Sequence, residues 1–182
     1  MVVSSRLFGI GLTFRGNIEK VITLPITGYV PYFNRTIVPH LTLIYPFMPV
    51  FSLYRVNEQL EIVAQGTKPF RIVFDGIRYF ENESNVVYAA VAHIRAVKRL
   101  HFDLAGSLEG LIKEQQTDGR YNLEKFVPHV TIINKVPDDS FAELKKRLPK
   151  YTLHYEENIT DFTLFAETKG VWQPKRVFKL EG

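Results

Sequence analysis

The sequence contains no cysteine among its 182 residues. This absence excludes disulfide bonds, thiolate metal ligands and cysteine nucleophiles, and it is typical of a reducing compartment. Long apolar runs are also missing, because no stretch approaches the roughly 20 apolar residues that a membrane-spanning helix needs. The apolar run Leu7–Leu12 lacks the charged start and the small-residue cleavage site of a signal peptide. We therefore expect a soluble, cytoplasmic protein with no membrane partner.

Neither charge sign dominates, since 23 lysines and arginines face 19 acidic residues and leave a net charge of +4. Such a mild excess favours an anionic ligand without specifying one. The 46% hydrophobic and 13% aromatic content is enough for a sizeable core, which excludes disorder and low complexity. No Gly/Ser-rich or Pro-rich linker divides the chain. The composition therefore predicts one domain that spans residues 1–182.

Segments with the chemistry of β-strands predominate, and three segments have helical periodicity instead. The predicted strands cover residues 6–14, 39–47, 70–74, 77–80, 86–91, 126–136, 159–166 and 176–180, with a turn-prone connector at 81–85 that indicates a hairpin. The predicted helices cover residues 53–63, 94–111 and 141–148. Because strands and helices mix without regular βαβ alternation, the sequence predicts an α+β fold.

One short motif occurs twice. Residues 37–44 and 126–133 agree at five of eight positions, and each copy carries a proline, a histidine and a threonine. The two histidines, His40 and His129, lie 89 residues apart. On a strand, His40 and Thr42 point to one face while the leucines between and after them point to the other. Each copy thus combines an apolar back with a polar front that carries one imidazole and one hydroxyl.

Two such fronts across a cleft suit displacement at phosphorus. One histidine can remove a proton from the nucleophile while the other protonates the leaving oxygen, because imidazole titrates near neutral pH. The hydroxyls of Thr42 and Thr131 can donate hydrogen bonds to phosphate oxygens. We therefore expect His40, Thr42, His129 and Thr131 to form a catalytic site that needs neither a metal ion nor another cofactor.

Two interpretations without catalysis compete with this one. In the first, the chain is an RNA- or nucleotide-binding module that keeps the cleft but does not turn over a substrate. In the second, it is a structural or interaction protein in which both motifs serve only to form strands. A single His-x-Thr on a strand is usually structural. The repetition favours function, because a duplicated frame alone gives no reason to retain two titratable side chains.

The paired motifs Pro39-His40-Leu41-Thr42 and Pro128-His129-Val130-Thr131 resemble the signatures of the two-histidine phosphoesterase superfamily, which includes RNA 2′,3′-cyclic phosphodiesterases and 2′-5′ RNA ligase-like proteins. The resemblance implies a bilobal α+β fold in which two antiparallel sheets with flanking helices surround a central cleft with pseudo-two-fold symmetry. It also implies acid–base roles for both histidines and phosphate contacts from both threonines. The implied substrate is a nucleotide or RNA end with a 2′,3′-cyclic or 2′-5′ phosphodiester.

Substrate contacts outside the motifs are predicted from chain position and residue type. Lys135 would share the face of His129 if its strand continued, and it could then neutralise a phosphate. Trp172 lies in a predicted loop and is the least core-like aromatic residue. The pool from which a base-stacking platform could be drawn consists of Tyr79, Phe80, Tyr88, Phe165 and Trp172.

The remaining histidines show no metal-binding spacing. His93, His101 and His154 are predicted to be surface or boundary residues. Tyr45 is predicted to point away from the face of His40, because the two lie an odd number of positions apart on a regular strand.

Overall fold

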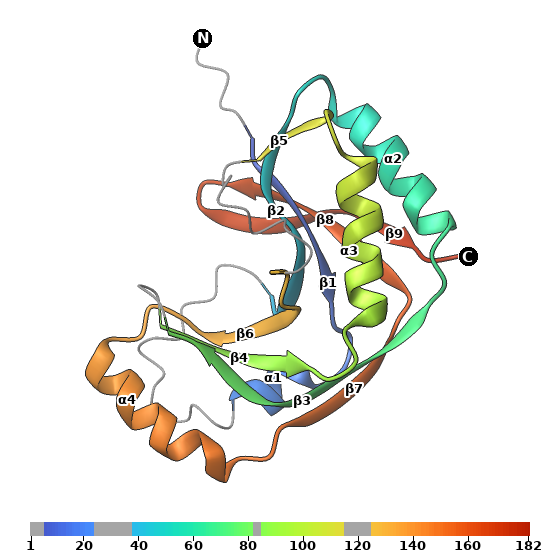
Figure 1. Ribbon diagram of the computed structural model, residues 1–182. Coiled ribbons are helices and arrows are strands. Elements are labelled where there is room, and N and C mark those ends of the chain that lie inside the picture. Colours follow the sequence, from blue (N-terminus) through green and yellow to red (C-terminus); the bar gives the residue numbers. More distant parts are fainter. Residues whose placement is uncertain (1–5, 24–37, 82–84, 115–124) are drawn as a thin grey trace.

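The computed structural model describes residues 6–23, 38–81, 85–114 and 125–182, and Figure 1 shows its ribbon. Its strands are β1 (Phe8–Thr13), β2 (His40–Pro49), β3 (Phe70–Phe80), β4 (Val86–Val91), β5 (Ile112–Glu114), β6 (His129–Ile133), β7 (His154–Ile159), β8 (Asp161–Thr168) and β9 (Val171–Lys179). Its helices are α1 (Ile18–Thr23), α2 (Leu53–Gln65), α3 (Arg95–Ser107), α4 (Asp138–Arg147) and the 3₁₀ helix η3 (Leu148–Lys150).

The described strands form one antiparallel sheet in the order β7-β3-β4-β6-β2-β1-β8-β9, with β5 paired to β2. The predicted α+β class is confirmed. The two expected sheets are joined edge to edge, because β6 and β2 pair through one bridge between Leu41 and Val130. The half that contains β6 carries the second motif, and the half that contains β2 carries the first. The expected pseudo-two-fold symmetry of the two halves stays a prediction.

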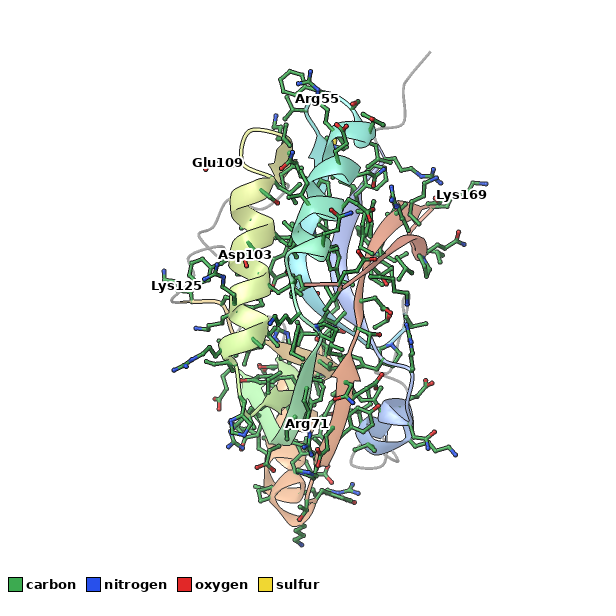
Figure 2. The ribbon with its side chains drawn as sticks, turned by 90° about the vertical axis from the view of Figure 1, so that its right-hand side faces the viewer. Arg55, Arg71, Asp103, Glu109, Lys125 and Lys169 are labelled. Carbon is green, nitrogen blue, oxygen red and sulfur yellow. The ribbon has the colours of Figure 1, made fainter. Side chains whose placement is uncertain are left out.

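Two amphipathic helices cover the half of the sheet that contains β2. Helices α2 and α3 lie side by side in both views (Figure 1 and Figure 2), with α3 against β2 and α2 against β9. Their larger buried apolar residues are Val56, Leu60 and Val63 of α2 and Val97, Leu100 and Leu104 of α3. Each fully buried side chain of this size contributes about 1.5–3 kcal/mol. The apolar residues that the sequence spaces at helical intervals are therefore the ones that these two helices bury.

Strand β1 holds the centre of this half together. Gly11 pairs with Thr42 of β2 on one side and with Thr163 of β8 on the other. Ile10 and Leu12 of β1 are almost fully buried. The apolar back of the first motif, Leu41, is fully buried as well. Strand β2, which carries His40, thus pairs with a neighbour, β1, whose side chains are buried in the core.

Several strand boundaries differ from the predicted ones. The hairpin of β3 and β4 is confirmed, and residues 82–84 of its connector lie outside the described residues. The predicted strand 159–166 is the junction of β7 and β8, which separate at Thr160 and pair with different neighbours, β3 and β1. Within the described ranges, no helix is both long enough and apolar enough to cross a membrane.

The prediction for His101 is wrong, because its side chain is only 1% exposed. It lies on α3, its ring stacks on Phe126 with centroids 3.9 Å apart, and its Nδ1 lies 2.7 Å from the carbonyl oxygen of Leu43 in β2. Burial lowers the pKa of this imidazole, and the bond to the carbonyl raises it in part. His101 is therefore a core residue whose hydrogen bond connects α3 to β2. The other two, His93 and His154, are exposed as predicted.

Candidate active site

Each motif begins its strand with the histidine itself. His40 is the first residue of β2, and His129 is the first residue of β6. The preceding prolines, Pro39 and Pro128, have no N–H to donate to a ladder, which places both strand starts directly after them.

The bridge between Leu41 and Val130 joins the two motifs at their centres. Continuing this antiparallel register by one residue places His40 opposite Thr131 and Thr42 opposite His129. Directly opposite residues share a face, and diagonal neighbours lie about 7–8 Å apart. Leu41 and Val130 are fully buried on the back of the sheet, while the four polar residues are half-buried on the front. The two histidines are therefore diagonal neighbours on one face.

Both imidazoles are held by the same local hydrogen bond. His40 Nδ1 lies 2.9 Å from the carbonyl oxygen of Val38, and His129 Nδ1 lies 2.7 Å from that of Val127. A carbonyl accepts, so Nδ1 is the donor, and in the neutral ring the lone pair then resides on Nε2. The same nitrogen, Nε2, is thus the basic atom in both motifs.

His129 is enclosed by aromatic rings. The ring centroids of Phe80 and Tyr88 each lie 5.1 Å from that of His129, and these two rings stack on each other at 4.3 Å. Burial lowers the pKa of His129, and the hydrogen bond to Val127 raises it in part. Both causes act on the same ring, and the enclosure by aromatic side chains has the larger effect, which favours the neutral form of His129.

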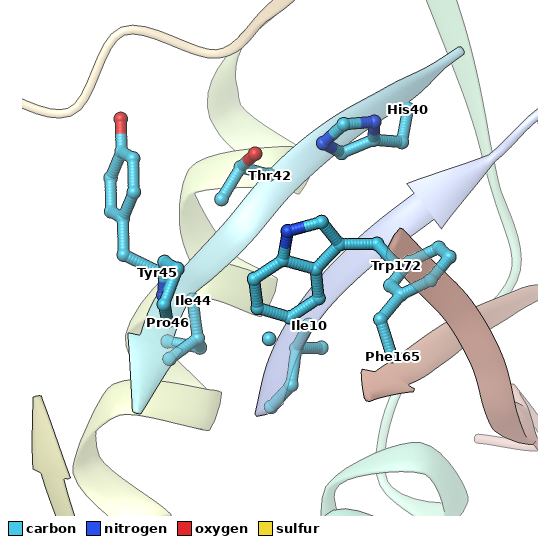
Figure 3. Close-up of a pocket in the computed structure, with 9 residues that line it drawn as sticks. Ile10, His40, Thr42, Ile44, Tyr45, Pro46, Phe165 and Trp172 are labelled. Carbon is cyan, nitrogen blue, oxygen red and sulfur yellow. The ribbon is translucent and has the colours of Figure 1, made fainter. Parts of the chain in front are cut away.

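His40 borders a pocket of about 190 Å³, shown in Figure 3. The pocket lies over β1, β2 and the β8–β9 hairpin, and the residues that line it are Gly9, Ile10, His40, Thr42, Ile44, Tyr45, Pro46, Phe165 and Trp172. The ring of Phe165 lies 6.0 Å from that of His40. Aromatic side chains and one imidazole thus surround an open space beside the first motif.

Two glycines of β1 lie close to the first motif, and one of them, Gly9, lines the pocket. A Cβ atom at Gly9 would lie 3.4 Å from the indole of Trp172. A Cβ atom at Gly11 would lie 2.8 Å from the carbonyl oxygen of Leu41 and 3.6 Å from Cδ2 of His40. Sequence reasoning missed both. The available signal was a pair of glycines two residues apart in an apolar strand, since a glycine inside a strand often marks a close approach.

The predicted site residues divide between the two halves of the sheet. His40, Thr42 and Trp172 line the pocket. His129 and Thr131 adjoin them through the bridge between β2 and β6. The aromatic pool divides likewise, with Phe165 and Trp172 near His40, Phe80 and Tyr88 on His129, and Tyr79 against Phe141 of α4.

Two predictions from strand alternation do not match the structure. Strand β6 ends at Ile133, and Lys135 follows in a turn with a φ of 55°, so the condition for sharing the face of His129 is not met. Tyr45 lines the pocket, contrary to the prediction. The pairing of β1 with β2 shifts between Ile44 and Phe47, and such a bulge interrupts the alternation of side chains.

The groups that the site supplies are two imidazoles, two hydroxyls and aromatic surface. Within the four described ranges, no cluster of three or more histidine, aspartate or glutamate side chains is arranged to hold a metal ion. The arrangement places these two imidazoles and two hydroxyls on one face of the sheet, beside an aromatic pocket.

Comparison with known proteins identifies relatives of the chain in sequence and in fold. An Oceanobacillus iheyensis protein named "Putative phosphoesterase" is 32% identical over 130 residues, which cover 71% of each chain. The fold is that of TT0787 from Thermus thermophilus, with a TM-score of 0.71, 21% identity and coverage of 97% of this chain and 98% of that one. It is also that of E. coli LigT, with a TM-score of 0.69, 15% identity and the same coverage.

LigT has also been crystallised in a complex with 3′-AMP, and that structure matches with a TM-score of 0.62 at 14% identity over 97% of this chain and 98% of that one. The family described as the 2′-5′ RNA ligase superfamily matches residues 26–170. Since this match covers well over half of the sequence, the chain belongs to the 2′-5′ RNA ligase superfamily of two-histidine phosphoesterases.

Proposed function

We propose that the protein hydrolyses a phosphodiester of a nucleotide or an RNA end, a 2′,3′-cyclic phosphate or a 2′-5′ linkage, by acid–base catalysis from His40 and His129 without a metal ion. One observation carries the proposal. The two imidazoles use the same Nδ1–carbonyl bond and flank a single bridge between two strands. This arrangement gives each Nε2 a fixed direction on one face, as a pair of proton-transfer groups requires.

The proposed reaction assigns different roles to the two rings. Nε2 of His129 takes a proton from water while the water oxygen forms a bond to phosphorus. The bond from phosphorus to the leaving oxygen breaks, and that oxygen takes a proton from Nε2 of His40, which enters the reaction as the imidazolium with both ring nitrogens protonated. Thr42 and Thr131 donate to the non-bridging oxygens, where negative charge accumulates. The assignment follows from the enclosure of His129, because burial lowers its pKa and keeps more of the ring in the neutral form that can accept a proton.

The pocket beside His40 suits a nucleobase. The half-buried Trp172 offers flat apolar surface beside the almost fully buried Phe165, and a base stacked on an aromatic side chain gains about 1–3 kcal/mol. The crystallisation of LigT with 3′-AMP supports a nucleotide ligand for this fold. We place the base of the substrate against Trp172.

Turnover is expected to survive excess EDTA, because the proposed proton transfers need no Lewis acid. A panel of 2′,3′-cyclic nucleotides, RNAs ending in a cyclic phosphate and 2′-5′-linked dinucleotides, assayed with the chelator, identifies the substrate. Activity that disappears with EDTA and returns with a divalent cation would show that the histidines act differently. Binding of the panel with no turnover at all would favour the non-catalytic binding module.

The acid limb of the pH profile of kcat/KM should lie below pH 6.5, the ordinary value for histidine. His129 acts in its neutral form, which is populated above its pKa, and burial lowers that pKa. The variant Phe80→Ala exposes the ring to water, so the limb should move upward toward pH 6.5 and activity at low pH should fall.

The control for this measurement is Phe102→Ala, which removes a phenyl group that is 41% exposed on α3. Its profile should coincide with that of the unmodified protein. If the acid limb stays in place in Phe80→Ala, His129 is not the group whose deprotonation the limb reports.

A further inference from the structure

A row of side chains crosses the sheet from β3 to the active site. Arg78 of β3 pairs with Tyr88 of β4, and Tyr88 pairs with Thr131 of β6. Directly paired residues share a face of the sheet. Neighbouring strands are about 4.8 Å apart, so Arg78 lies two strands, or about 10 Å, from the backbone of Thr131. Arg78 thus belongs to the same row as a threonine of the second motif.

Side-chain contacts confirm which face this is. Phe80, two residues from Arg78 on β3, contacts the rings of Tyr88 and His129. The intervening residue, Tyr79, packs against Phe141 of α4 instead. Residues two apart on a strand point the same way. Arg78 therefore lies on the face of the catalytic histidines.

The charge of Arg78 is not neutralised by a carboxylate in the part of the chain that the structure describes. Its Nη1 donates to the carbonyl oxygen of Ile77 at 3.1 Å. Arg71, seven residues earlier on β3 and labelled in Figure 2, forms an ion pair with Glu156. The field of Arg78 reaches Tyr88, where it lowers the pKa of the hydroxyl, although burial is the larger effect and raises that pKa. The guanidinium of Arg78 and the phenol of Tyr88 thus lie on neighbouring strands, on the face of the sheet that carries the histidines.

This pair makes the two sides of the site unequal. On the side of His40 lies the aromatic pocket, and on the side of His129 lie Arg78 and Tyr88. We propose that Arg78, with the hydroxyl of Tyr88, binds a second phosphate group of the substrate, beyond the scissile phosphodiester. This inference rests on the proposed function, because it takes the scissile phosphate to lie between the two histidines.

The substrate class follows from this placement. A substrate that occupies both sides has a nucleoside in the pocket, the scissile diester between the histidines and another phosphate on the far side. A cyclic mononucleotide has no group to place there. The second phosphate is either a terminal monophosphate or the next diester of an oligonucleotide, and arginine binds both through its planar fork of donors. The site is thus adapted to a linear oligonucleotide.

The test compares four substrates: a cyclic mononucleotide, a dinucleoside monophosphate, the same dinucleotide with a terminal phosphate, and a trinucleotide. In the unmodified protein, each second phosphate should raise kcat/KM about tenfold, the low end for a charge-assisted hydrogen bond. In Arg78→Gln the two dinucleotides should become equal, while the cyclic mononucleotide is turned over as before. If only the trinucleotide gains, the second phosphate is a diester. If only the terminal phosphate helps, it is a monoester.

Arg71→Gln is the matched control, because it removes the same charge from the same strand and should keep the tenfold preference. Calorimetry measures the binding of phosphorothioate-linked dinucleotides with and without the terminal phosphate. This measurement separates the proposed second-phosphate subsite from the proposed phosphoesterase activity. A binding preference that Arg78→Gln abolishes, in the absence of turnover, would overturn the phosphoesterase proposal and keep the subsite. Turnover of all four substrates without any preference, or a preference that survives in Arg78→Gln, would overturn the subsite.

Discussion

Alanine in place of His40 or His129 should lower kcat/KM by about 10²–10⁴-fold each, the usual contribution of a positioned acid or base. Both imidazoles are held by a carbonyl at Nδ1 and lie on one face, so neither can substitute for the other. Because they serve one transition state, the double variant should be little worse than the poorer single variant. The measurement is steady-state kinetics on the substrate that the panel identifies.

His93→Ala is the control for these variants, because His93 is exposed outside the site, and its removal should leave kcat/KM unchanged. Thr42→Val and Thr131→Val should cost less than either histidine, since each removes one neutral hydrogen-bond donor. Full activity of His40→Ala on a substrate that needs His129 would contradict the paired mechanism. The first motif would then be a structural strand.

Gly11→Ala should lower kcat by about 100-fold, a loss typical of a catalytic group displaced by about 1 Å. The new methyl group would lie 2.8 Å from the carbonyl oxygen of Leu41, a separation that a Cβ atom cannot keep. Strand β2 must therefore shift away from β1, and the ring of His40, 3.6 Å from the same point, shifts with it. Steady-state kinetics measures the loss, and thermal unfolding measures any accompanying change in stability.

Two further variants separate displacement of His40 from general damage. Gly106→Ala on α3 meets no atom within 4 Å and should keep full activity, with a gain in stability from better helix propensity. In a His40→Ala background, Gly11→Ala should add almost nothing, because the group that it displaces is already absent. An equal further loss in that background would show that Gly11 acts by another route.

The paired motif of the candidate site could be recognised from the sequence because each copy is local. A proline, a histidine and a threonine at fixed spacing on a strand determine which side chains share a face, and a second copy supplies the partner. The structure adds the bridge between Leu41 and Val130, which no local rule predicts because the two residues are far apart in sequence. The α+β class was predictable for the same reason, since it depends on local periodicity.

The errors arose where local rules were extended past an irregularity. A bulge in β2 turned Tyr45 toward the pocket, and a turn with positive φ ended β6 before Lys135. The burial of His101 depends on which face of α3 meets β2, which a histidine on a helix does not reveal. Arg78 was missed because its relation to Thr131 passes through two strand registers.

The position of β1 also constrains the order in which the protein can fold. Gly11 lies between Thr42, 31 residues further along the chain, and Thr163, 152 residues further along. Contacts between residues so far apart in sequence form slowly, because closing the intervening loop costs conformational entropy before the contact contributes any stability. During synthesis, the strand that supports His40 must therefore wait, with one edge unpaired, until β8 has left the ribosome. The pairing of β1 with both of its neighbours is therefore completed only after residues 161–168 have been synthesised.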